Sequence, residues 1–303
     1  MNIKTYQTYL FRLPGIIIIF YFMIFISAFG MNSTESISAF TEKTRDSQES
    51  KTFCPSLKLY AIQTNVTDLD RAVSFYEDLG FFLVTKDHFP RVAPMKNNST
   101  LLVLHKVEKL APTDPEGARA TLNLAVKNLD VIINKFKTKG IKIIHQEPQK
   151  AAIGFWKAIV DPFGNIINLI ELNRPLENLE KPRVNNISIV GTDIDQAVHF
   201  YSNLLGLDIF SVKYYPVIPL KVEGVVNNIA LHATADKTVE KIYPNGTQTF
   251  LVFEVQDLIS TLEYLKSKGV ELLHDTPQQA TVGIYVAFRD PFGLVHEALE
   301  LKK

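Results

Sequence analysis

The chain has 303 residues, of which 46% are hydrophobic and 21% charged, an ordinary globular balance with room for two domains. Lysine plus arginine and aspartate plus glutamate both number 32, so the formal net charge of zero gives no electrostatic reason to expect a nucleic-acid partner. Cys54 is the only cysteine, which excludes an intrachain disulfide and a cysteine-based metal cluster.

Residues 1–30 have the layout of a secretory signal peptide. Lys4 and Arg12 precede an apolar run that ends at Phe29, and the small residues Ala28 and Gly30 fit a cleavage site. The run is shorter than the roughly 20 residues that cross a bilayer comfortably. We therefore expect a cleaved signal and a secreted protein, with an uncleaved N-terminal membrane anchor as the alternative.

Residues 31–55 are rich in serine, threonine, glutamate and lysine, and they lack hydrophobic periodicity. This composition predicts a disordered spacer. Several Asn-x-Ser/Thr triplets later in the chain agree with entry into a secretory pathway. Asn245, in the turn-like stretch "YPNGT", is the preferred glycosylation site if the source organism glycosylates its proteins.

The rest of the chain is a tandem repeat. "TDLDRAVSFYEDLGF", from Thr67, returns as "TDIDQAVHFYSNLLGL", from Thr192. "GFWKAIVDPFG", from Gly154, returns as "GIYVAFRDPFG", from Gly283. Self-similarity of this kind marks a duplicated structural unit. It divides the chain into a first unit, a linker with prolines and charges, and a second unit, at residues 56–173, 174–183 and 184–303.

Each unit is predicted to alternate strands and helices. In the first, "LKLYAIQTNV" reads as a strand, and Thr67 and Asp70 match a capping box that opens a helix ending at Gly80. Strands are predicted at "FFLVT", "TLLVLHKV" and "ATLNLAV". A second amphipathic helix then ends at Gly140, and the strands "KIIHQ", "FWKAIV" and "NIINLIEL" follow. The second unit repeats the order, with helices near 193–205 and 257–268.

These segments resemble a known family. "DLDRAVSFYEDLGF", the helix end "KTKG" and "DPFGNIINLIEL", each with a counterpart in the second unit, resemble the vicinal oxygen chelate superfamily, which includes glyoxalase I, bleomycin resistance proteins and extradiol dioxygenases. The resemblance covers nearly everything from residue 56 to 301. It implies an α+β fold in which four βαβββ modules form two tandem cup-shaped domains.

The resemblance also implies a divalent metal in the cup, where it acts as a Lewis acid on the substrate. Such a metal needs about three or four histidine, glutamate or glutamine ligands. The family's positions fall in the first unit at Ala61, Thr121 and Asn168, none of which is a good ligand. Further inner-strand positions fall near Val103 and Ala230, among apolar residues.

In the second unit the corresponding positions are Asn186, Phe250 and Glu297. Glu297 is the only residue that matches a ligand type of the family, and a lone carboxylate does not hold a catalytic divalent ion without help from water or substrate. Exchange of ligands between the units still gives one strong donor. The sequence therefore predicts a degenerate metal site, with a divalent metal as a possible cofactor in a divergent one.

Other polar residues on the strands have plainer expected roles. His105 and His232 are expected at the surface or in ordinary hydrogen bonds, unless the strand alignment slips by one residue. Strand alternation sends His296 to the face opposite Glu297. Glu171 and Glu300 are expected as solvated charges on the outer face.

Two functions remain open. The first is a small-molecule-binding protein with a degenerate metal site, and a monomer, since the fused units supply the surface that single-unit relatives obtain by dimerising. The alternative is a divalent-metal-dependent lyase, isomerase or dioxygenase with a divergent site in the second unit around Glu297, Asn186 and His232. Aromatic residues on the strand before each turn fit the apolar wall of a ligand site. The candidate ligand-binding residues are Glu297, Asn186, Asn168, Tyr285 and Trp156.

Overall fold

Four consecutive modules of strands and one helix build the fold, which confirms the predicted α+β class. The computed structural model describes residues 55–110, 118–210, 217–224, 228–233 and 248–303. The expected signal peptide, the spacer up to residue 54 and Asn245 lie outside these residues. Within the described part of the chain, no helix is long and apolar enough to cross a membrane.

The elements follow in chain order. The first module contains β1 (Lys58–Val66), α3 (Leu69–Asp78), β2 (Phe82–Leu83), β3 (Val92–Asn97) and β4 (Thr100–Lys106). The second contains β5 (Arg119–Val126), α4 (Leu129–Thr138), β6 (Lys142–Ile143), β7 (Gln149–Ala151), β8 (Gly154–Val160) and β9 (Ile166–Leu172). The third contains β10 (Arg183–Gly191), α5 (Ile194–Val198), the π-helical turn η2 (His199–Leu204), β11 (Ile218–Lys221), β12 (Glu223–Gly224) and β13 (Asn228–Ala233). The fourth contains β14 (Thr249–Glu254), α6 (Leu258–Ser267), β15 (Gln278–Gln279), β16 (Gly283–Arg289) and β17 (Val295–Leu301).

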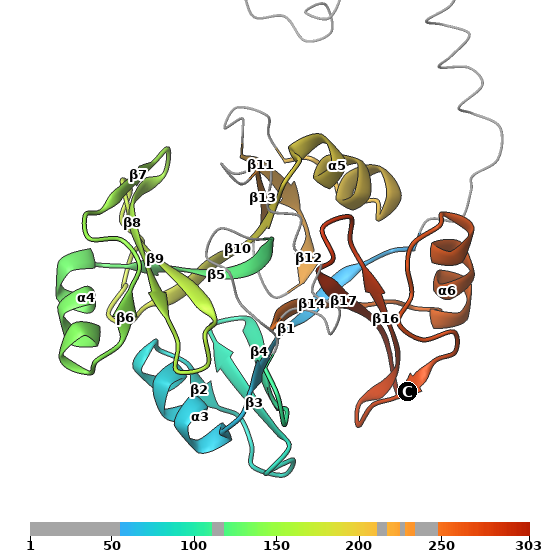
Figure 1. Ribbon diagram of the computed structural model, residues 1–303, viewed down its shortest axis with the longest axis horizontal. Coiled ribbons are helices and arrows are strands. Elements are labelled where there is room, and N and C mark those ends of the chain that lie inside the picture. Colours follow the sequence, from blue (N-terminus) through green and yellow to red (C-terminus); the bar gives the residue numbers. More distant parts are fainter. Residues whose placement is uncertain (1–54, 111–117, 211–216, 225–227, 234–247) are drawn as a thin grey trace, which may run out of the picture. The chain divides into compact units, whose positions relative to one another are not determined.

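The strands form two sheets that do not follow the sequence repeat. Sheet A has the order β15-β16-β17-β14-β1-β4-β3-β2, so it joins the first module to the fourth. Sheet B has the order β11-β13-β10-β5-β9-β8-β6, so it joins the second module to the third. In Figure 1 the blue β1 accordingly lies beside the orange-red β14 from near the other end of the chain. Apart from the two-residue β12 of the third module, which pairs with β1 in sheet A, each sheet therefore takes one module from each repeat unit.

Antiparallel pairs close both sheets at the seam between modules. β1 pairs with β14 from Lys58 opposite Glu254 to Thr64 opposite Thr249, and β10 pairs with β5 in the same way. Both seams carry one register shift near the start of the first strand of each repeat unit, at Tyr60 and at Asn185. Such a bulge lets two residues oppose one and bends the strand locally. The equivalent irregularities show that the repeat is preserved in backbone geometry as well as in sequence.

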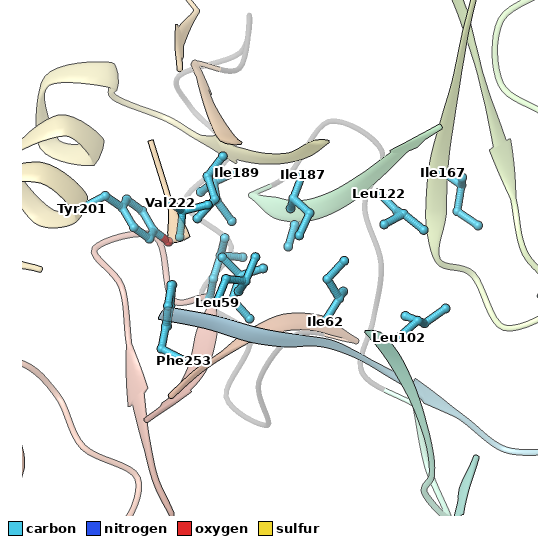
Figure 2. Close-up of a cluster of buried hydrophobic side chains, with 14 of the residues drawn as sticks. Leu59, Ile62, Leu102, Leu122, Ile167, Ile187, Ile189, Tyr201, Val222 and Phe253 are labelled. Carbon is cyan, nitrogen blue, oxygen red and sulfur yellow. The ribbon is translucent and has the colours of Figure 1, made fainter. Parts of the chain in front are cut away.

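One face of each sheet contributes to a shared hydrophobic core. Figure 2 shows Leu59 and Ile62 of sheet A pointing toward Ile187 and Leu122 of sheet B. The apolar sides of the helices join the same core, as Tyr76 of α3 and Leu265 of α6 illustrate, both about 1% exposed. Strand alternation turns the other face of each sheet away from this core.

Each of the α-helices α3 to α6 begins at an aspartate or asparagine N-cap. The N-cap of α3 is Asp68, whose carboxylate accepts a hydrogen bond from the Arg71 amide, so the predicted cap at Thr67 was wrong by one residue. Asn128, Asp193 and Asp257 cap α4, α5 and α6 in the same manner. A short side-chain oxygen satisfies one of the amides left unpaired in the first turn.

The repeated "DPFG" stretch is a tight turn held by its aspartate. Asp161 Oδ1 accepts hydrogen bonds from the amides of Phe163 and Asn165, both at 2.8 Å, and the equivalent Asp290 does the same for Phe292 and Leu294. The glycine of each turn has a positive φ, 94° at Gly164 and 80° at Gly293, where a side chain is disfavoured. The turn delivers the last strand of each unit, β9 or β17, into its sheet.

Candidate functional site

Face A is the side of sheet A that points away from the shared core. It contains a small apolar cluster of Ala61, Phe250, Val252 and Leu299, with Tyr60, Leu101, Val103 and Tyr285 packed against it. Gln63 and His105 follow at the next positions of β1 and β4, and their side chains are 3.4 Å apart. Burial lowers the pKa of His105, which favours its neutral form.

Glu297 is the carboxylate in the middle of this apolar face. It lies on β17 opposite Ala287 of β16 and Val252 of β14. Within the described part of the chain it has no hydrogen-bond or ion-pair partner. Burial raises the pKa of Glu297 to about 7, because a carboxylate loses hydration there without compensation. The group is therefore divided between its acid and its anion near neutral pH.

Tyr285 stands close to Glu297 on the neighbouring strand. Burial raises the pKa of the Tyr285 phenol, and the charge of Glu297 raises it further. The two residues therefore share one environment. The ring of His274 packs edge-on against Tyr285 at 6.2 Å between centroids.

Face B is the corresponding side of sheet B, and a row of asparagines crosses it. Asn168 on β9 stands opposite Asn123 on β5, which stands opposite Asn186 on β10. Asn168 Nδ2 donates to Asn123 Oδ1 at 2.8 Å, and Asn123 Nδ2 donates to Asn186 Oδ1 at 3.0 Å. Asn186 Nδ2 then donates to Asn228 Oδ1 on β13 at 3.2 Å. We call Asn168, Asn123, Asn186 and Asn228 the asparagine row.

A second branch of hydrogen bonds leaves the row at Asn123. Its Nδ2 also donates to Ser188 Oγ at 2.7 Å, and Ser188 Oγ lies 3.0 Å from His232 Nε2. Ser188 Oγ accepts a hydrogen bond from Asn123, so we assign its hydroxyl as the donor to His232 Nε2. In that tautomer the imidazole proton is on Nδ1. Burial, aided by the positive charge of Arg119, lowers the pKa of His232 to about 4, so the ring is neutral.

The two faces differ at equivalent positions. On face A the row across the strands reads Ala287, Glu297, Val252 and Ala61. On face B the matching row reads Ala158, Asn168, Asn123 and Asn186. Along this row face A is thus apolar with a single acid, whereas face B carries neutral, hydrogen-bonded amides.

The structure separates residues that the sequence had grouped. Glu297 and Tyr285 lie on face A, whereas Asn168, Asn186 and Trp156 belong to sheet B. The prediction of a single site around Glu297, Asn186 and His232 was therefore wrong. Glu297 is in sheet A and the other two residues are in sheet B, because each sheet combines modules from different repeat units. His232 has an ordinary hydrogen bond, as expected.

Residues on the opposite face have structural roles. His296 lies on the face opposite Glu297, as alternation predicts, and that face is buried there. The Nε2 atom of His296 lies 2.7 Å from the Tyr201 hydroxyl, which donates to Asp290 Oδ2 at 2.7 Å. Glu171 and Glu300 were expected to be solvated. Each instead accepts a hydrogen bond from the first amide of a helix, at Leu129 and Leu258. The asparagine row, by contrast, escaped the sequence analysis at Asn123 and Asn228, although an asparagine in a strand is a usable signal since it is rare there.

The residues at the family's metal-ligand positions do not form a donor set. On face A they are Ala61, Phe250 and Glu297, and on face B they are neutral amide and hydroxyl groups. Among the described residues, no group of three or more histidine, cysteine, aspartate or glutamate side chains could hold a metal ion. A catalytic divalent ion needs about three such protein ligands, so the side chains present at these positions do not fit one.

Comparison with known proteins decides the family. The model of the Glyoxalase/Bleomycin resistance protein/Dioxygenase superfamily matches residues 58–169 and 183–298. The chain belongs to this superfamily. Its two matched segments coincide with the two copies of the sequence repeat, so the expected family and its two tandem cup domains are confirmed. No curated protein matches this superfamily member by sequence.

Solved structures show the same fold. Glyoxalase I from Zea mays superimposes with a TM-score of 0.60 at 19% sequence identity, over 81% of this chain and 92% of that one. A putative dioxygenase from Bacillus subtilis subsp. subtilis str. 168 gives a TM-score of 0.56 at 14% identity, over 83% of this chain and 87% of that one. At these identities the likeness is one of fold, and the function of this superfamily member depends on its own faces A and B.

Proposed function

We propose that this superfamily member binds a small, partly apolar molecule on face A, with Glu297 as its recognition group. The observation that carries the proposal is an acid in an apolar surrounding with no protein partner among the described residues. Leaving a carboxylate in such a place costs stability. A ligand that satisfies it gains the hydrogen bond and removes the penalty, while apolar walls and one convergent polar group are the usual make-up of a small-molecule site.

The chemistry of face A selects the ligand class. Phe250, Val252 and Tyr285 offer an apolar and aromatic wall, and Glu297 is the ionisable group in it. A pKa near 7 allows the carboxyl group to donate a hydrogen bond as the acid or to pair with a cation as the anion. We expect a ring-containing apolar molecule with one amine, carbonyl or hydroxyl group.

A second candidate function is proton transfer. An acid with a pKa near 7 is suited to general acid–base catalysis at neutral pH, and Glu297 would move a proton at the carbon beside a carbonyl group, as a lyase or isomerase of the superfamily. The metal-dependent form of this alternative, including a dioxygenase, requires further ligands, because Glu297 is the one metal donor at the family's ligand positions on face A.

One set of measurements separates these functions. Binding of benzylamine and acetophenone to the purified full-length chain is followed by ligand-observed NMR, with Glu297→Gln compared to Glu263→Gln, an exposed acid on α6. Binding that weakens about ten-fold or more in Glu297→Gln alone, about 1.4 kcal/mol, supports the proposal; equal binding in both variants contradicts it.

Exchange of the acetophenone methyl hydrogens with solvent deuterium, lost in Glu297→Gln, identifies the proton-transfer enzyme. A stoichiometric divalent metal in the purified protein, lost in the same variant, identifies the metal-dependent one.

The setting of this activity is a proposal from sequence alone. The apolar segment and cleavage-like residues within 1–30 support secretion, with membrane attachment through that segment as the alternative. We further propose a monomer, because both sheets are completed by modules of the same chain. Mass determination of the N-terminus of the exported protein, and light scattering of the purified one, test these two points.

A further inference from the structure

We propose that face B is a second ligand site, independent of the one proposed on face A, and that it takes an uncharged, polyhydroxylated ring such as a sugar or cyclitol. The proposal rests on hydrogen-bonding capacity that the asparagine row does not use, on a buried hydroxyl without a partner, and on an aromatic ring placed beside them. The amides and the hydroxyl have no counterpart at the equivalent positions of face A, which keeps only an aromatic ring, Tyr285.

The asparagine row keeps groups for a ligand at its end. Each asparagine amide has two N–H donors and an oxygen that accepts twice. Asn123 in the centre spends both donors, on Asn186 and Ser188, whereas Asn168 at the end of the row spends one, on Asn123. Asn168 therefore presents a second N–H and its carbonyl oxygen in fixed orientation. Neighbouring donors and acceptors of this kind complement hydroxyl groups, which both donate and accept.

Thr121 supplies the independent observation. It lies on β5 opposite Ser188, in the row next to Asn123 and on the same face. The Thr121 side chain is about 1% exposed, and within the described residues its Oγ1 has no hydrogen-bond partner. A buried hydroxyl without a partner costs about 1–3 kcal/mol. A ligand hydroxyl that reaches it removes that cost.

The charge of face B favours a neutral ligand. The asparagine row, Thr121 and Ser188 are uncharged, and His232 is neutral because burial lowers its pKa to about 4. Two cations border face B. Arg119 lies beside His232 and already takes part in an interaction of its own, and Lys221 is exposed on β11 opposite Asn228, at the end of the row away from Asn168. An ion on face B would lose hydration without a counter-charge dedicated to it.

Trp156 provides the aromatic surface. It stands on β8 opposite Ile170, two positions along the strand from Ala158, which pairs with Asn168. The ring of His145 packs edge-on against it at 4.6 Å between centroids, which fixes its orientation. An indole offers a broad apolar face against which the C–H side of a sugar ring packs, while the ring hydroxyls reach the amides.

The single tryptophan makes the test specific to this face. The chain contains one tryptophan, Trp156, so the intrinsic indole fluorescence of the purified full-length protein reports on face B. D-glucose, D-galactose and myo-inositol are titrated as neutral probes, with D-glucuronate and uracil as anionic and amide probes. We expect a saturable change with at least one neutral probe, and about ten-fold weaker binding in Thr121→Val. The melting temperature of Thr121→Val should stay equal or rise, because its hydroxyl has no partner to lose.

Several outcomes overturn the proposal. No saturable response to any neutral probe, a response confined to D-glucuronate or to uracil, or equal affinity in Thr121→Val each contradicts it. If Thr121→Val does not fold, Asn168→Ala replaces it with the same expected loss. Glu297→Gln is titrated in parallel: loss of the sugar response in that variant would contradict independence of the two faces, whereas failure of the face A ligand alone leaves face B unaffected.

Discussion

Glu297 and Asn168 occupy the same place in two different sheets. Glu297 pairs with Ala287 and Val252, and Asn168 pairs with Ala158 and Asn123. The repeat has therefore preserved the backbone position and changed its chemistry. The acid stands alone among apolar side chains, whereas the amide is one end of a hydrogen-bonded row. This difference at one equivalent position leads to different predictions for the two faces.

Stability should depend on pH through Glu297. Its pKa is about 7 in the folded protein and near the ordinary glutamate value of 4.5 when unfolded, so the folded state holds the proton more tightly. The contribution is fully present below pH 4.5 and is lost as the pH rises through 7. We expect this group to lower the free energy of unfolding by up to about 3 kcal/mol between pH 4.5 and pH 8.

Urea unfolding of the wild type and of Glu297→Gln at pH 5 and pH 8 checks this. The variant should be the more stable of the two at pH 8, and its unfolding free energy should change less between the two pH values. A constant difference between the proteins at both pH values would contradict the assigned burial of the carboxylate.

Substitution at the centre of the asparagine row, Asn123, should lower the free energy of unfolding. Asn123→Val reproduces the residue found at Val252, but it removes the partners of Asn168 and Asn186. We expect a loss of about 1–3 kcal/mol in urea unfolding, because buried amides are left unpaired. A double-mutant cycle with Asn168→Ala should show coupling; additive effects would mean that the row is not a connected network.

The buried tyrosines of the two repeat units should differ in importance. The Tyr201 hydroxyl lies 2.7 Å from both Asp290 Oδ2 and His296 Nε2, while the Tyr76 hydroxyl reaches Asp161 Oδ2 at 3.2 Å. Tyr201→Phe should cost about 2 kcal/mol and Tyr76→Phe about 1 kcal/mol. Thermal unfolding of the two variants side by side tests the order, and a larger loss in Tyr76→Phe would refute it.

Glu300 should stabilise the start of α6. Its carboxylate accepts the Leu258 amide at 2.9 Å, one of the amides that a helix leaves unpaired at its N-terminus. Glu300→Ala should therefore cost about 1 kcal/mol, measured by chemical denaturation. Glu263→Ala, which removes an exposed acid from the same helix, serves as the control and should change stability by less. Equal losses would assign the effect to helix charge rather than to the hydrogen bond.

The sequence by itself determined the local structure and the family. The spacing of apolar residues, the capping residues and the glycine after each helix act between residues that are close in the sequence. The structure confirms the helices that these signals predict. Capping was misplaced at Thr67 because the adjacent Asp68 offers an equally short acceptor, and backbone geometry chooses between them. Face assignment also follows from alternation, which correctly separated His296 from Glu297.

Only the tertiary structure decided which residues share a face. A strand's pattern specifies the side that it buries, but it does not specify the strand beside which it lies. Two homologous units present nearly equivalent edges, so β1 has equally plausible partners within its own unit and across the repeat. Pairing of β1 with β14, and of β5 with β10, is settled by contacts distant in sequence. That pairing assembles Asn168, Asn123, Asn186 and Asn228 into one row and leaves Glu297 among apolar neighbours.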